Sequence, residues 1–182
     1  SCSYSILEKK SVRNVGPGIN VREGASILIV LMGALGDVVR GLSLVAQLKA
    51  NFPSCTVTWL VEPKCAGVVR LHPGIDKVVV FARGQRGAFA GLIRDLRAQR
   101  FDLVLDLQRH FKSGVFSLIA KLTSRTTQSM AFHRSNSKEG NWLLHRATGG
   151  STVPAYDRHA AKLGNYLSFI PALGGTVREP LD

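Results

Sequence analysis

The sequence has few cysteines, and they do not form the patterns that would make them structural. Its three cysteines, Cys2, Cys55 and Cys65, are an odd number without a CxxC pair. A disulfide framework needs a denser, even set, and a structural zinc site needs paired ligands, so both are disfavoured. The histidines show no ligand spacing with cysteines or carboxylates either. We therefore expect no metal, and the cysteine content fits a reducing cytoplasm.

Long apolar runs are also lacking. The longest strongly apolar stretch, from Ser26 to Gly36, falls short of the roughly 20 residues that span a bilayer. Residues 1–24 mix charged side chains with glycine and proline, without the apolar core of a signal peptide. We expect a cytoplasmic protein in which residues 1–25 form a flexible leader.

Acidic residues are scarce relative to basic ones. The sequence has 12 Asp and Glu residues and 24 Lys and Arg residues, which gives a formal net charge of +12. Such a field attracts nucleic acid, an anionic membrane face or a phosphorylated substrate, although a generally basic surface is an equal alternative. Aromatic and basic residues do not interleave and no known reader motif occurs, so nucleic acid is not the expected partner.

Apolar runs rich in β-branched residues alternate with segments of helical periodicity, which is typical of a parallel sheet covered by helices. The pattern predicts strands at 27–32, 56–61, 77–81, 103–105 and 126–132. It predicts helices from after Gly36 to 51, at 64–71, 89–96, 111–122 and 160–170, with the last ending before Pro171, and a helical turn at 142–146. The expected fold class is α/β, a Rossmann-like doubly wound parallel sheet over residues 26–173. Residues 174–182 would begin a linker.

Ligands of such sheets bind beyond the carboxyl ends of the strands, so the loop after Met32 is the first place to look. It reads GALGDV over residues 33–38, and its two glycines let backbone N–H groups approach an anion at a helix N-terminus. The spacing departs from the dinucleotide fingerprint G-x-G-x-x-G, although Glu62 could mimic its ribose-binding acid. No Walker A sequence occurs, so a P-loop nucleotidase is not supported.

Asp37 in this loop has two compatible interpretations. It could cap the following helix, as Asp commonly does. A carboxylate at the tip of the first strand could also accept a proton from a substrate hydroxyl, and a positioned base of this kind accelerates a reaction by roughly 10²–10⁴-fold.

Five segments in order resemble the heptosyltransferase family, glycosyltransferase family 9. They are ILIVLMGALGDVV (27–39), FPSCTVTWLVEP (52–63), LHPGIDKVV (71–79), RFDLVLDLQRHFKSG (100–114) and DRHAAKLGNYL (157–167). The first resembles the family's opening strand and its Leu-Gly-Asp-Val loop. Each segment is weak evidence alone, but the five occur in order along the chain from about Ile27 to Ile170.

The resemblance implies the N-terminal half of a glycosyltransferase-B fold, in which two Rossmann-like domains face a cleft. The first domain binds the acceptor, the inner core of lipopolysaccharide, and the second binds the sugar nucleotide, usually ADP-heptose. Transfer inverts the anomeric centre and needs no metal, and Asp37 would be its general base. Such an enzyme would work in the cytoplasm, as a peripheral protein on the anionic inner-membrane face.

The resemblance and the strand ends together give a set of candidate substrate-binding residues. Two directly precede the base, two follow the third strand, two follow the fourth, and one follows the fifth. They are Leu35, Gly36, Arg83, Arg86, Gln108, Lys112 and Arg134. Arginine binds phosphate and carboxylate bidentately, which suits an inner-core acceptor, but solvated surface charge is an equal alternative for Arg83 and Arg86.

No second strand–helix array follows Ile170, so the donor-binding domain is not in this sequence. We expect the chain alone to have negligible transferase activity. Two alternatives stay open, namely a Rossmann-type nucleotide-binding protein and a non-catalytic module that binds a phosphorylated or anionic ligand.

Overall fold

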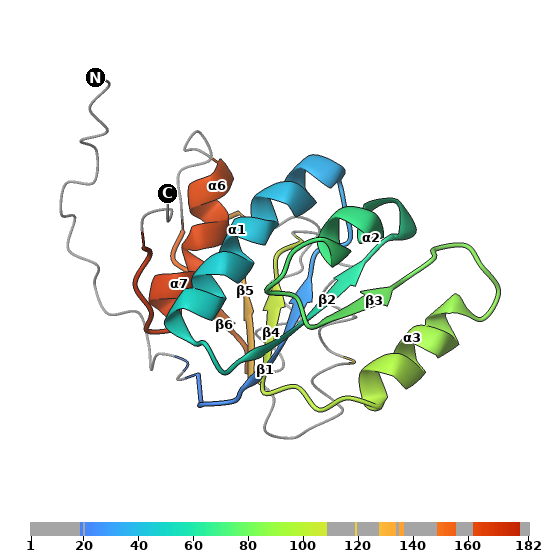
Figure 1. The fold of residues 1–182 in the computed structure, drawn as a ribbon, viewed down its shortest axis with the longest axis horizontal. Helices are drawn as coiled ribbons and strands as arrows, with labels where there is room; N and C mark the ends of the chain where they lie inside the picture. Colours follow the sequence, from blue (N-terminus) through green and yellow to red (C-terminus); the bar gives the residue numbers. More distant parts are fainter. Residues whose placement is uncertain are drawn as a thin grey trace.

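The computed structural model describes residues 19, 21–108, 119, 128–133, 135–136, 149–155 and 162–178. These residues form one parallel sheet with helices packed on it (Figure 1). The strands are β1 (Ser26–Val30), β2 (Thr56–Val61), β3 (Lys77–Val80), β4 (Leu103–Asp106), β5 (Gln128–Ala131) and β6 (Ser151–Thr152). The helices are α1 (Leu35–Asn51), α2 (Pro63–Arg70), α3 (Ala88–Arg97), α6 (Lys162–Leu167) and α7 (Phe169–Ala172).

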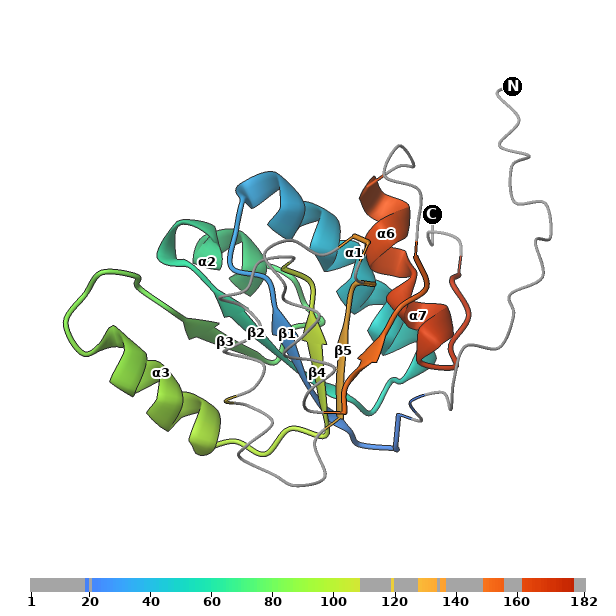
Figure 2. The ribbon, with the colours of Figure 1, turned by 180° about the vertical axis from the view of Figure 1, so that it is seen from behind.

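The sheet has the strand order β3-β2-β1-β4-β5-β6, and every neighbouring pair is parallel (Figure 2). The chain runs outward from β1 through β2 to β3, then returns to the other side of β1 and continues from β4 to β6. This is the doubly wound Rossmann-like order, and it confirms the predicted fold class. The order reverses between β1 and β4, where such folds bind their ligands.

The alternating side chains of β1 serve two separate cores. Ile27 and Ile29 pack with α1, α2, α6 and α7 in one cluster, whereas Leu28 and Val30 pack with α3 in the other. All four side chains are fully buried. Because a buried Val, Leu or Ile contributes about 1.5–3 kcal/mol, burial on both faces holds this strand firmly at the centre of the sheet.

Helix α1 lies unusually close to the sheet at Gly41. A Cβ atom built there would stand 2.8 Å from Leu31 Cδ2 and 3.0 Å from Trp59 Cη2. The indole N–H of Trp59 in turn donates a hydrogen bond of 2.9 Å to the carbonyl oxygen of Leu31. The absence of a side chain at Gly41 therefore lets α1 pack against the chain segment that leads out of β1.

The structure differs from the sequence prediction at the last helix and at the last strand. The region expected as one helix over 160–170, ending before Pro171, contains two helices, and Pro171 lies inside α7. Pro171 is the third residue of that helix, in the first turn, where a backbone N–H has no partner within the helix to lose. The short strand β6 was not expected. The helix predicted at 111–122, apart from Ile119, and the turn predicted at 142–146 lie outside the described residues.

The described residues at both ends of the chain contact the domain. In the predicted leader, Ile19 and Ala25 are buried, and the N–H of Gly24 donates to Ser54 Oγ at 3.0 Å. In the predicted linker, residues 175–178 run along α1. The side-chain amide of Asn51 exchanges two hydrogen bonds with the backbone of Thr176, and that of Gln47 does the same with Arg178. The boundaries at 25/26 and 173/174 stay predictions.

Cys55 and Cys65 are free thiols buried in the core. Among the described residues, no helix combines the length and the apolar character needed to cross a bilayer.

Candidate active site

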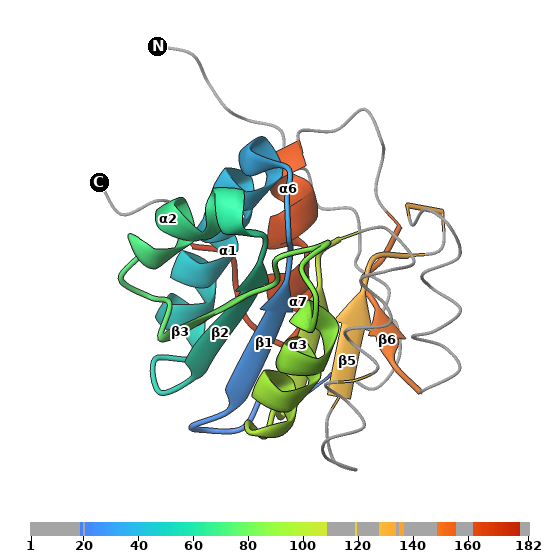
Figure 3. The ribbon, with the colours of Figure 1, turned by 90° about the vertical axis from the view of Figure 1, so that its right-hand side faces the viewer.

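The strands next to the point where the strand order reverses, between β1 and β4, end at the same level; we call this point the switch point. Val30 of β1 pairs with Leu60 on one side and with Asp106 on the other. The segments that follow β1, β2 and β4 therefore emerge at the same edge of the sheet. Figure 3 shows the chain leaving β1 at this edge and leading into α1.

Asp37 is the third residue of α1, not its N-cap. The N-cap is Ala34, which has no side chain that could cap, and its carbonyl oxygen accepts the N–H groups of Asp37 and Val38 at 3.0 Å each. The N-cap interpretation of Asp37 is therefore wrong, because the helix begins two residues before it. A carboxylate in the first turn still interacts favourably with the helix dipole, by about 0.3–1 kcal/mol.

The Asp37 carboxylate is open to solvent. Its side chain is 32% exposed, and Oδ1 accepts a hydrogen bond of 3.1 Å from Nη1 of Arg40. The same Arg40 nitrogen donates to the carbonyl oxygen of Gly36 at 3.0 Å. A carboxylate held in this way at the rim of a parallel sheet is accessible to a sugar hydroxyl and can accept its proton.

Gln108 bridges the end of β4 to the loop after β1. Its Oε1 accepts the N–H of Met32 at 2.7 Å, and its Nε2 donates to the carbonyl oxygen of Gly33 at 3.1 Å. Its own N–H donates to Oδ1 of the fully buried Asp106. The predicted site residue Gln108 thus lies beside the loop that leads to Asp37. Its side-chain amide contacts the backbone of that loop at Met32 and Gly33.

A second charged cluster lies at the ends of β2 and β3. Glu62 is paired through Oε1 with Arg83 at 3.1 Å and through Oε2 with Lys64 at 3.3 Å. Gly33 adjoins this cluster, since a Cβ atom there would stand 3.4 Å from Lys64 Cε. The sequence pattern indicated Glu62 only as a ribose ligand and gave no direct sign that it pairs with Arg83. Parallel pairing of the two strands that carry them was the available signal.

The other predicted site residues are distributed unevenly. Leu35 is 53% exposed at the start of α1, and Gly36 follows it with its carbonyl bound to Arg40. Arg86 is exposed in the loop between β3 and α3. Lys112 and Arg134 lie outside the described residues. In the ranges that the structure describes, no group of three or more His, Cys, Asp or Glu side chains could hold a metal ion.

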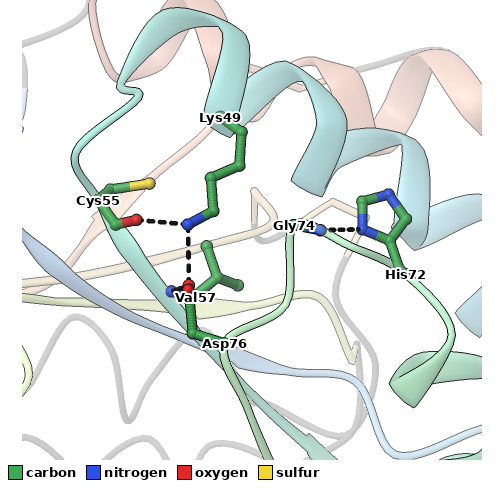
Figure 4. A network of polar contacts seen from close by, with 6 residues as sticks. All are labelled: Lys49, Cys55, Val57, His72, Gly74 and Asp76. Atoms are coloured by element: carbon green, nitrogen blue, oxygen red, sulfur yellow. Dashed lines mark hydrogen bonds and ion pairs between the residues drawn. The ribbon is translucent and has the colours of Figure 1, made fainter.

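The LHPGID segment is structural and precedes β3, at the amino ends of the parallel strands. Figure 4 shows the contacts of His72, Gly74 and Asp76. Asp76 Oδ2 accepts hydrogen bonds from Lys49 Nζ at 2.8 Å and from the N–H of Val57 at 2.7 Å. Burial raises the pKa of Asp76, but these hydrogen bonds and the Lys49 charge outweigh burial and lower it overall. Lys49 also donates to the carbonyl oxygen of Cys55 at 2.6 Å, so the network ties α1, β2 and β3 together.

His72 belongs to the same turn. Its Nδ1 accepts the N–H of Gly74 at 3.1 Å, and burial lowers the pKa of its imidazole. This hydrogen bond requires Nδ1 to be unprotonated. The contact therefore favours the neutral ring, and His72 is a turn residue rather than a site residue.

Comparison with known proteins identifies both similar sequences and similar solved structures. The lipopolysaccharide core heptosyltransferase OpsX of Haemophilus influenzae is 28% identical over 120 residues, which cover 65% of this chain and 33% of that protein. The lipopolysaccharide heptosyltransferase 1 of Campylobacter coli is 27% identical over 95 residues, or 51% of this chain and 28% of that protein. The chain thus spans about a third of the length of these curated relatives. No protein-family profile matches it.

The solved structures agree with the fold. The Escherichia coli heptosyltransferase WaaC bound to ADP-2-deoxy-2-fluoro heptose superposes with a TM-score of 0.70 at 18% identity, covering 86% of this chain and 50% of that one. A glycosyltransferase family 9 structure from Veillonella parvula also gives 0.70 at 18% identity, covering 87% of this chain and 44% of that one. At this identity the structures support the shared fold alone.

Proposed function

We propose that this chain, which is related by sequence and fold to the lipopolysaccharide heptosyltransferases of glycosyltransferase family 9, is the acceptor-side half of such an enzyme. The observation that carries the proposal is the position of Asp37. Its exposed carboxylate stands at the switch point of the sheet, within the Leu-Gly-Asp-Val segment through which the chain resembles this family.

In the proposed reaction, Asp37 takes the proton of an acceptor hydroxyl as its oxygen attacks the anomeric carbon of ADP-heptose. A carbon–oxygen bond forms to the acceptor, the bond from the anomeric carbon to the diphosphate breaks, and ADP leaves with that electron pair. Attack from the face opposite the diphosphate inverts the anomeric centre. The proposal includes neither a metal nor a resident cofactor, and the donor would be bound by a second domain outside these residues.

The acceptor is proposed to be the lipopolysaccharide inner core, which carries carboxylate and phosphate groups. Arg83 and Arg86 lie in the loop beyond β3, and Arg83 already binds a carboxylate, that of Glu62. A guanidinium that pairs with Glu62 in the free protein can exchange part of this contact for an acceptor anion. Lys112 and Arg134 complete the proposed set.

The basic surface suggests where the protein works. A net charge of +12 favours contact with the anionic lipids of a membrane face, where the lipid-linked acceptor would be found. We therefore propose a cytoplasmic protein that associates peripherally with the inner membrane.

The substitution Asp37→Asn tests the proposal, because it keeps the shape of the side chain but removes the base. In the complete two-domain enzyme, ADP release from ADP-heptose and a heptose-free core acceptor should fall by about 10²–10⁴-fold. The thermal unfolding midpoint should stay within a few degrees, since the carboxylate is partly exposed.

The matched control is Asp95→Asn, which changes an exposed aspartate that also pairs with an arginine, on α3. Its turnover should stay within twofold of the parent enzyme. Turnover of Asp37→Asn within tenfold of the parent would show that this carboxylate is not the base. Tight binding of NAD(H) by the chain, measured by fluorescence titration, would instead favour a dinucleotide-binding protein.

A further inference from the structure

We infer that Gln108 and Arg40 are positioning residues that hold Asp37 in place for the reaction. Gln108 fixes the start of the loop that leads to the carboxylate, and Arg40 fixes the carboxylate itself. This inference rests on the proposed role of Asp37 as the base, but it concerns two side chains that do not themselves exchange the proton.

The contacts of Gln108 continue the sheet beyond the end of β1. The N–H of Leu107, the residue before Gln108, donates to the carbonyl oxygen of Val30 at 3.1 Å. The Gln108 side chain then takes over, accepting from Met32 and donating to Gly33. On the opposite side the N–H of Glu62 donates to the carbonyl oxygen of Met32 at 3.0 Å. The loop is therefore held from both neighbouring strands.

This bridge requires both ends of one side-chain amide. The oxygen of Gln108 must accept while its nitrogen donates, and a carboxylate or an apolar group of the same size cannot do both. Loss of the bridge would free residues 32–34 on the β4 side. These residues set where α1 begins, because the carbonyl oxygen of Ala34 makes the first bonds of that helix.

Arg40 holds the other end of the same loop. One nitrogen, Nη1, donates both to the carbonyl oxygen of Gly36 and to Oδ1 of Asp37. The first bond anchors the guanidinium to the helix backbone, so the second fixes the direction of the carboxylate. Both side chains are partly exposed, 43% for Arg40 and 32% for Asp37, and such pairs contribute little to folding stability. Substitution of Arg40 should therefore leave the fold intact, so that a change in turnover reports on the position of the carboxylate.

Positioning matters because proton transfer requires the base within hydrogen-bond reach of the hydroxyl. A displacement of about 1 Å in a reacting group can cost on the order of 100-fold in rate. Since neither side chain needs to touch the acceptor for this, their loss should lower kcat without weakening acceptor binding.

Steady-state kinetics of the complete two-domain enzyme test the inference. We expect Arg40→Met and Gln108→Leu to lower kcat by about 10–100-fold while KM for the acceptor changes less than threefold. Arg40→Lys should recover part of the loss, because an ammonium group can still reach the carboxylate. The matched controls are Arg94→Met, which removes another exposed arginine paired with an aspartate, and Gln99→Leu, which removes an amide bound to the Asp95 carbonyl and to the Thr58 hydroxyl. Both controls should stay within twofold.

A double substitution shows whether Arg40 acts through Asp37. In the Asp37→Asn background, Arg40→Met should lower the residual rate by less than twofold, since there is no base left to position. An undiminished further loss would mean that Arg40 acts elsewhere and would overturn its assignment.

Hydrogen exchange of the chain itself tests Gln108 without any turnover. The amide of Met32 should exchange at least tenfold faster in Gln108→Leu and stay unchanged in Arg40→Met. Should Gln108→Leu fail to fold, Gln108→Glu keeps the acceptor for Met32 but loses the donor to Gly33, and it should still lower kcat. Unchanged exchange at Met32 would overturn the role of Gln108.

The outcomes separate the two proposals. An active Asp37→Asn enzyme would remove the proposed base and with it the proposed function. An inactive Asp37→Asn enzyme combined with Arg40→Met and Gln108→Leu enzymes within twofold of the parent would retain the function and overturn the positioning inference alone.

Discussion

At the scale of single residues, the groups with shifted pKa values in the described part of the chain are Cys55, His72 and Asp76, and they lie away from Asp37. His72 and Asp76 occupy the turn before β3, where their contacts are with backbone and with Lys49. Shifted pKa values often mark functional sites, but ion-pair networks that support a fold shift them too. The contacts of His72 and Asp76 in the LHPGID segment therefore have a structural explanation in this chain.

His72 predicts how stability depends on pH. Burial lowers the pKa of His72 below its ordinary 6.5, so below that pH the unfolded chain binds a proton that the folded protein resists. The contribution of His72 is fully present above about pH 6.5 and declines as the pH falls toward the lowered folded-state pKa. The free energy of unfolding in urea, measured between pH 7.5 and 5, should fall less steeply in His72→Gln than in the parent chain. Identical slopes would contradict this assignment.

Residue-scale patterns predicted part of the site. The position of Asp37 after the first strand followed from its motif, because an apolar run and two glycines fix where strand and loop lie. Asp37 and Arg40 stand at the i, i+3 spacing of one helix, so their ion pair was open to prediction. The bridge from Gln108 to Met32 and Gly33 could not be read in advance, since it depends on the path of the loop backbone. The substrate-binding role of Lys112 stays a prediction, because this residue lies outside the described residues.

At the scale of elements, the long periodic segments were predictable and the short ones were not. Strand β2 was predicted at its observed bounds, because its β-branched and aromatic residues follow one another until Glu62 and Pro63 end the run. Strand β6 has only Ser151 and Thr152, which carry no apolar signal and join the sheet through pairing with β5. The break between α6 and α7 was hidden because their apolar residues share one helical period across it.

The close packing of α1 on the sheet predicts the effect of enlarging Gly41. Gly41→Val would place new atoms against Leu31 and Trp59, and overpacking of this kind costs about 1–3 kcal/mol. Urea unfolding should show this loss. The control is Gly67→Val in α2, where a Cβ atom meets nothing within 4 Å and the stability should be unchanged or slightly higher. Equal stability of the two variants would mean that α1 can move outward freely.

At the scale of the whole molecule, the excess of basic residues predicts salt-dependent membrane contact. We expect the chain to sediment with vesicles containing phosphatidylglycerol at low salt and to be released at about 1 M salt, where charges are screened beyond about 3 Å. Vesicles of phosphatidylcholine alone are the control and should bind little. Binding that is equal on both vesicle types, or unaffected by salt, would contradict an electrostatic attachment.

Helix α1 joins two distant parts of the molecule. Its first turn carries Asp37, and near its other end Gln47 and Asn51 hold Arg178 and Thr176. From Gln47 to Asn51 the helix rises about 6 Å, which is close to the length of the two extended residues from Thr176 to Arg178. Because Thr176 is bound to Asn51 and Arg178 to Gln47, the later segment runs antiparallel to the helix. The backbone at Arg178 consequently heads toward the rim that bears the carboxylate. A displacement of the segment at Arg178 would therefore move the helix whose first turn carries Asp37, the proposed base.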